Sequence, residues 1–107
     1  MPLTRDFRET VMTRVKPDPG DFAALLAGLK KLQDRQYHRP PLSKPVGDEL
    51  FELRHVGKLN TRVLYFFMKG QRIVAVHGIR NKAREIPERD RKTALERKQD
   101  WLARHPR

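Results

Sequence analysis

Three short segments that read as consecutive β-strands place the strongest constraint on how this chain folds. Residues 50–56, 61–69 and 72–79 are rich in β-branched and aromatic side chains, and glycine-containing segments separate them. Gly70-Gln71 fits a two-residue hairpin turn with glycine in the first central position, and residues 57–60 fit a longer turn. Segments connected this closely pair as neighbours, so they predict a three-stranded antiparallel meander.

Helical patterns flank the strands. Residues 4–15 predict a short helix, because Thr4 can cap it and Phe7, Val11 and Val15 recur at every fourth position. A second helix is expected from residue 21 to about residue 36, with an apolar stripe made of Phe22, Leu25, Leu26, Leu29 and Leu32.

A third helix is expected from about residue 87 to residue 103. Pro87 suits its first position, and its apolar stripe consists of Ala94, Leu95, Trp101 and Leu102. Residues 38–47 contain three prolines and predict an ordered, irregular connector, with a flexible linker as the alternative. The expected fold is therefore α+β: two N-terminal helices, a meander of three strands with a fourth left open, and a C-terminal helix.

Composition narrows the class of protein. The 107 residues suit one domain spanning 1–107, and 24 Lys and Arg against 13 Asp and Glu give a net charge of +11. Such a charge favours nucleic acid or the ribosome as partner, with an anionic membrane or an acidic protein as alternatives. The absence of cysteine excludes disulfides, zinc–thiolate sites and thiol catalysis. With no signal-peptide pattern and no long apolar run, we expect a soluble cytoplasmic protein.

Counting outward from the two turns gives an expected register for the strands. It pairs Lys69 with Arg72, Leu64 with His77, Arg62 with Ile79, and Arg54 with Arg62. Alternation then predicts an apolar face that packs on the helices, made of Phe51, Leu53, His55, Val63, Tyr65, Phe67, Val74 and Val76. The opposite face carries Leu50, Glu52, Arg54, Arg62, Leu64, Phe66, Ile73, Ala75, His77 and Ile79.

The opposite face is unusual because two arginines and a histidine lie among apolar residues. Unpaired arginines are costly to bury, so this face predicts an open cleft in which they bind an anion. The alternative is a solvated cross-strand ion pair of Glu52 with Arg54 or Arg62.

Four blocks of this chain, in order, resemble phage-derived, HigB-like toxins of the RelE superfamily. The first two, Glu49-Leu50-Phe51-Glu52-Leu53-Arg54 and Thr61-Arg62-Val63-Leu64-Tyr65-Phe66, resemble the strands "GLWELR" and "YRVLYF". The third, Val76-His77-Gly78-Ile79-Arg80-Asn81-Lys82, resembles the strand end "LHGFxKK". The fourth is Pro87 followed by a basic helix, and the resemblance runs from about Phe22 to Leu102.

This resemblance implies a RelE-like fold and the toxin of a bacterial type II toxin–antitoxin system. Family members are mRNA endoribonucleases that mostly act on the ribosome, and a small helix-turn-helix antitoxin of HigA type silences them. The resemblance implies no cofactor and no membrane, and it implies contact with DNA only through the antitoxin complex.

Two features depart from the family pattern. Family members usually begin with a strand, whereas residues 3–11 read here as helical, which leaves two alternatives: the sheet lacks that strand, or this segment folds differently from the helix expected here. The chain also lacks the tyrosine that some members carry near the last helix, since its two tyrosines are Tyr37 and Tyr65. These departures keep open a non-catalytic alternative that binds RNA, the ribosome or an antitoxin.

The expected chemistry is attack of a ribose 2′-OH on the adjacent phosphate, without a metal. Arg62 is the first candidate for stabilising the transition-state charge, with Arg54 as a further clamp and His77 as general acid or base. Arg80, Lys82 and Lys58 are expected to bind RNA. For His77 and Lys58, the alternatives are a hydrogen-bonded strand-end residue and a solvated turn residue. Glu52 could be a base, but orienting an arginine suits it better.

Overall fold

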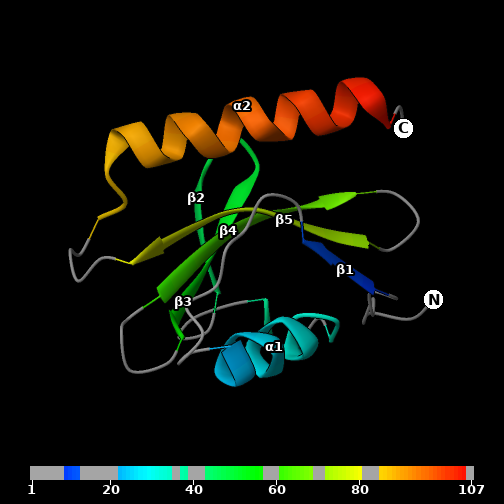
Figure 1. The fold of residues 1–107 in the computed structure, drawn as a ribbon, viewed down its shortest axis with the longest axis vertical. Helices are drawn as coiled ribbons and strands as arrows, with labels where there is room; N and C mark the ends of the chain where they lie inside the picture. Colours follow the sequence, from blue (N-terminus) through cyan, green and yellow to red (C-terminus); the bar gives the residue numbers. More distant parts are fainter. Residues whose placement is uncertain are drawn as a thin grey trace.

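The computed structural model describes residues 9–12, 22–34, 37–38, 43–56, 61–68, 72–80 and 85–105. Within them the chain forms, in order, β1 (Glu9–Met12), α1 (Phe22–Lys31), β2 (Ser43–Gly47), β3 (Leu50–Val56), β4 (Thr61–Met68), β5 (Arg72–Arg80) and α2 (Glu88–Arg104). The fold is α+β, with α1 and α2 on opposite faces of one sheet (Figure 1).

The five strands lie in the order β1-β5-β4-β3-β2. Strands β2 to β5 form an antiparallel meander, which confirms the three expected strands and resolves the open question of a fourth. β1 pairs with β5 in parallel, from Glu9 beside Arg72 to Met12 beside Ala75.

The helix expected over residues 4–15 is wrong where the structure describes it, because residues 9–12 form a strand. Four residues are too few to show whether their apolar side chains repeat every second or every fourth position. The β-branched Thr10 and Val11 suit a strand, and the exposed edge of β5 supplies hydrogen-bonding partners. Of the two alternatives left open for this segment, the structure shows the second: it folds differently from the expected helix and adds a strand at the edge of the sheet.

The expectation of irregular structure over residues 38–47 is wrong at its end, where Ser43–Gly47 forms β2. Pro45 lies within this strand, and a sheet tolerates proline there because β2 is an edge strand. Gly47 leads into a two-residue turn in which Asp48 and Glu49 have φ values of 55° and 59°. These angles match the hairpin turn that normally favours Asn-Gly or Asp-Gly, so its sequence signal was absent.

The expected register holds on both sides of β4, up to one irregularity on each. Leu64 lies beside His77 and Arg62 beside Ile79, as expected, and β3 keeps its expected register from Phe51 to Leu53. The expected pairing of Lys69 with Arg72 is wrong, because Arg72 lies beside Met68.

The cause is a β-bulge in β5. Leu64 lies beside His77, but the next residue of β4, Tyr65, lies beside Ala75, so the pairing skips one residue of β5. The bulge places Val74 and Val76 on the face with Leu64, and Ile73 and Ala75 on the opposite face. These four residues were therefore assigned to the wrong faces.

Each face of the sheet has its own core. On the α1 face, Leu29 and Leu32 pack on a cluster completed by Leu53, Val63, Tyr65, Ile73 and Ala75. Gly28 lets α1 approach closely, because a Cβ at this position would lie 3.2 Å from a methyl group of Leu53.

On the α2 face, the buried cluster contains Leu50, Leu64, Phe66, Val74, Val76, Ile79 and Ala94. The expected stripe of α2 is confirmed, since Leu95, Trp101 and Leu102 also pack against this cluster. The structure thus covers with a helix the face that the sequence predicted to be an open cleft. Among the described residues, no helix combines the length and apolar character needed to cross a membrane.

Candidate functional site

Glu52 lies between two arginines on the α2 face of the sheet. Its Oε1 is 2.9 Å from Nε of Arg54, and its Oε2 is 3.6 Å from Nη1 of Arg62. Glu52 and Arg62 are almost fully buried, with 2% and 1% exposure, whereas the Arg54 side chain is 24% exposed. The cross-strand ion pair is therefore present. It is buried on the α2 face, however, whereas the pair expected as the alternative was a solvated one.

The charged groups of the three side chains lie close together, but not all of their polar atoms are hydrogen-bonded. Nε and Nη1 of Arg62 are buried atoms that make no hydrogen bond to any described residue, whereas Nε of Arg54 and Oε1 of Glu52 are in contact at 2.9 Å without the alignment of a hydrogen bond. Two guanidinium groups share one carboxylate, so the cluster has an excess of positive charge and of donors. Buried donors without acceptors are costly, which makes this cluster a candidate site for an additional acceptor group.

A pocket of about 270 Å³ reaches this cluster between β2 and the start of α2. Glu52 contributes to its wall. The other lining residues are Lys44, Pro45 and Val46 from β2, Glu85 and Ile86 from the segment before α2, and Glu88 and Arg91 from its first turns. The pocket therefore lies against the residue that the two arginines share.

His77 is held by two residues of α2. Its Nε2 lies 2.9 Å from Oδ1 of Asp90, and its Nδ1 lies 3.0 Å from Nη1 of Arg97. The same Arg97 nitrogen donates to the carbonyl oxygen of Val76 at 3.0 Å. Because Arg97 can only donate, Nδ1 accepts and the neutral ring carries its proton on Nε2. Both ring nitrogens are therefore engaged in joining β5 to α2.

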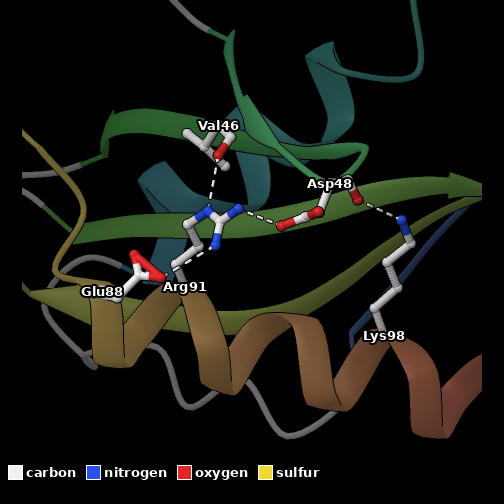
Figure 2. A network of polar contacts seen from close by, with 5 residues as sticks. All are labelled: Val46, Asp48, Glu88, Arg91 and Lys98. Carbon is white, nitrogen blue, oxygen red and sulfur yellow. Dashed lines mark hydrogen bonds and ion pairs between the residues drawn. The ribbon is translucent and has the colours of Figure 1, made fainter.

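A second set of contacts joins α2 to the β2–β3 turn (Figure 2). Arg91 contacts the Asp48 carboxylate, and its Nε donates to the carbonyl oxygen of Val46 at 3.2 Å. Lys98, only 6% exposed, donates from Nζ to the carbonyl oxygen of Asp48 at 2.7 Å. A Cβ on Gly47 would lie 3.2 Å from Nη2 of Arg91, so glycine suits this position as well as its φ of 97°.

The structure brings together only some of the expected site residues. Arg54 and Arg62 share Glu52, and His77 lies on the same face but bonds to α2. Arg80 is the last residue of β5, whereas Lys58 and Lys82 lie outside the described residues. The segments that contain these two lysines join the sheet at one end, because Val56 lies beside Thr61 and Thr61 beside Arg80.

Sequence reasoning missed the residues of α2 and of the turn that hold the helix on the sheet. Asp90 and Arg97, and likewise Arg91 and Lys98, are two helical turns apart and so share a face of α2. This spacing was readable in the sequence. Asp48 gave no signal of its own, because its role depends on the unforeseen turn.

Tyr65 lies on the α1 face, as expected, and its hydroxyl hydrogen-bonds with Oγ of Ser43. Burial raises the pKa of Tyr65 to about 12, although the bond to Ser43 lowers it slightly. This tyrosine is a core residue. Among the residues that the structure describes, no group of three or more His, Cys, Asp or Glu side chains could hold a metal ion.

Comparison with known proteins identifies a family. The model of the family described as phage derived protein Gp49-like (DUF891) matches residues 16–99 of the 107. The matched range includes α1, the four-stranded meander and most of α2. No curated protein matches the chain.

Proposed function

Since the chain belongs to the Gp49-like family of phage-derived proteins, we propose that it is the toxin of a type II toxin–antitoxin system and cleaves mRNA on the ribosome. The observation that carries this proposal is the arginine pair around Glu52, in which Nε and Nη1 of the buried Arg62 make no hydrogen bond to any described residue. The net charge of +11 supports a polyanionic partner. Ribosome-bound mRNA as substrate would place the protein in the cytoplasm.

In the proposed reaction, both the attacking group and the group attacked belong to the RNA. The ribose 2′-OH attacks the adjacent phosphorus, the bond to the 5′ oxygen of the next nucleotide breaks, and a proton passes from the 2′-OH to that leaving oxygen. The products are a 2′,3′-cyclic phosphate and a 5′-OH. Negative charge increases on the phosphoryl oxygens in the transition state, and fixed cations stabilise it there more than in the ground state.

Arg62 and Arg54 are the cations proposed for this charge. A guanidinium group can donate two parallel hydrogen bonds to a phosphate, and the unsatisfied nitrogens of this pair supply such donors. Glu52 orients both arginines. His77 remains the candidate general acid or base, and it would have to exchange its contact with Asp90 or Arg97 for one with the RNA.

Arg80, Lys82 and Lys58 are proposed to bind the RNA backbone. Their segments join the sheet at the end where β5 finishes and β4 begins, and β2 also begins at this end. Lys44 and Glu85, which line the pocket, belong to β2 and to the segment that follows β5. RNA bound at this end of the sheet would lie next to the pocket that reaches Glu52.

The test of this proposal is cleavage of mRNA by the wild-type protein and by Arg62→Ala. The wild type should arrest growth and cut ribosome-bound mRNA, and the variant should lose about a hundredfold to a thousandfold in cleavage rate. Arg62→Lys should recover only part of the rate, because lysine keeps the charge without the planar donors.

Arg104→Ala is the matched control. It also removes one arginine from an ion pair, but its partner Asp100 lies on the same helix and both side chains are about half exposed. Circular dichroism must show that Arg62→Ala is folded, since the substitution opens a buried pair. Cleavage by a folded Arg62→Ala at the wild-type rate would refute the assignment of Arg62.

The alternative function is a protein of the same fold that binds RNA, the ribosome or an antitoxin without cleavage. It is favoured by the burial of Arg62 and by the engagement of both His77 nitrogens. Its RNA affinity would fall steeply with salt concentration while no RNA was cut. Arginine-dependent cleavage by purified protein would eliminate this alternative.

We further propose a small helix-turn-helix protein of HigA type as the antitoxin, with DNA contacted only through their complex. An adjacent reading frame that encodes such a protein, and co-purification of the two products, would support this partner. Loss of growth arrest on co-expression would show that the partner neutralises the toxin.

A further inference from the structure

The two halves of α2 are attached to the sheet by different forces. Residues 88–93 contain no apolar side chain, and Ile86 just before the helix is only partly buried. From Ala94 onward, the helix carries the apolar side chains that pack on the α2 core, and Trp101 also donates from Nε1 to Sδ of Met68. The first half of the helix thus lacks the apolar anchorage of the second.

Charged contacts hold the first half in place. Arg91 contacts Asp48 and Val46, and Asp90 contacts His77. The Arg91 and Asp48 side chains are 29% and 43% exposed, so water and salt weaken their attraction. Attachment of this kind opens more readily than a buried apolar contact.

The start of α2 lies next to the arginine cluster on the same face of the sheet. Glu52, Glu88 and Arg91 line the same pocket, so the carboxylate that the two arginines share faces the start of the helix. Leu64 lies beside Glu52 on one strand and beside His77 on the other, and His77 bonds to Asp90 and Arg97. Movement of the start of the helix away from the sheet would expose Arg62 on the α2 face.

We propose that the first half of α2, together with residues 85–87, is a cover that opens away from the sheet while the second half stays docked. The cover admits a polyanion to Arg54 and Arg62, a consequence that rests on the proposed function. Glu85 and Glu88 belong to the cover and line the pocket with Glu52, so opening removes two carboxylates from the approach to the two arginines. A polyanion binds the open state more tightly than the closed state and shifts the population towards it.

Thiol labelling tests the motion directly, because the chain contains no cysteine. Leu64→Cys places a thiol beneath the first half of α2, and Val63→Cys places one on the α1 face of the same strand. Val74→Cys reports on the second half of the helix, since Val74 lies beside Phe66 and Lys98 lies over the Phe66 ring. All three native side chains are fully buried.

The rate of reaction with an aromatic disulfide reagent is measured for each variant under native conditions. The cover predicts that the thiol at position 64 reacts faster than those at positions 63 and 74, and that added salt accelerates the thiol at position 64 alone. Urea unfolding of each variant provides the global unfolding rate for comparison. Equal reactivity of all three thiols, at the rate of global unfolding, would overturn the proposal.

Arg91→Ala, introduced into the Leu64→Cys variant, should raise the reactivity of its thiol about threefold to fivefold, since it removes the two contacts that tie the helix to the sheet, the ion pair with Asp48 and the hydrogen bond to Val46, together with the ion pair to Glu88 within the helix. Arg104→Ala in the same background removes the ion pair with Asp100, which does not reach the sheet, and should leave the rate unchanged. An equal effect of both substitutions on the thiol at position 64 would contradict the assigned role of Arg91.

RNA separates this inference from the proposed function. If opening is observed and no RNA is cut, the cover stands and the endoribonuclease proposal fails. If the wild type cuts RNA while the thiol at position 64 stays as protected as the one at position 63, even with RNA bound, the endoribonuclease proposal stands and the cover fails.

Discussion

At the scale of single residues, Glu52 decides how two arginines are accommodated inside a small protein. Alternation in the strands correctly placed Glu52, Arg54 and Arg62 on one face, and sequence reasoning left an open cleft and an ion pair as alternatives. The structure contains the ion pair, buried beneath α2. Strand alternation could not choose between them, because the same residues share a face whether or not a helix covers it.

Tyr65 makes the stability of the fold depend on pH in the alkaline range. Its pKa in the folded protein is about 12, against 10.0 for a tyrosine side chain in water, chiefly because burial disfavours the charged form. The contribution of the neutral Tyr65 side chain to the free energy of unfolding is complete below pH 10. As the pH rises from 10 to 12, the free energy of unfolding falls by about 2 to 3 kcal/mol. In Tyr37→Phe, where Tyr65 is the sole tyrosine, we expect phenolate absorbance and loss of circular dichroism to rise together.

A phenolate that forms near pH 10 in the still folded protein would contradict this expectation. Tyr65→Phe in the same background supplies the control. It removes the titrating group and should flatten the fall in the free energy of unfolding between pH 10 and 12.

At the scale of elements, long and strongly patterned segments were predictable and short ones were not, although α1 ends at Lys31 where the helix was expected to continue to about residue 36. The 17 residues of α2 and the three strands β3, β4 and β5 were expected nearly where they lie. β1 has four residues, and its strand conformation depends on pairing with β5, which lies far away in the sequence. The bulge in β5 likewise left no local signal and reversed the faces of four residues.

The turn between β2 and β3 carries backbone strain. Glu49 has a φ of 59°, a conformation in which the Cβ of an L-residue is crowded, and its side chain is exposed. Glu49→Gly should therefore raise the free energy of unfolding by about 1 kcal/mol, measured by urea unfolding. Glu49→Ala is the control, since it removes the same charge but keeps the Cβ. Equal stability of the two variants would show that charge, and not backbone strain, governs this position.

At the scale of the whole molecule, the positive charge is unevenly distributed along the chain. Residues 80–84 contain Arg80, Lys82 and Arg84 and no acidic residue, whereas residues 88–104 combine six basic with four acidic residues. Helix α2 read as a basic surface in the sequence, yet Arg91, Arg97 and Lys98 contact the sheet or its turns. Its exposed positions mix basic residues with acidic ones. The proposed RNA-binding surface therefore lies at the end of the sheet and not on this helix.

The candidate site was only partly predictable for a related reason. Its strand residues follow from local alternation, whereas its cover, its pocket and the partners of His77 depend on how α2 docks across the sheet. Docking brings together residues far apart in the sequence, such as Asp48 and Lys98. Local patterns specify neither the position nor the contacts of such a helix.

The chemistry of the RNA ends tests the central claim most directly. Purified protein is incubated with ribosome-bound mRNA in parallel with Arg62→Ala, and the new ends are identified chemically. Attack by the 2′-OH predicts a 2′,3′-cyclic phosphate on one fragment and a 5′-OH on the other, both dependent on Arg62. Ends that carry a 3′-OH and a 5′-phosphate, or intact mRNA with active ribosomes, would contradict the account.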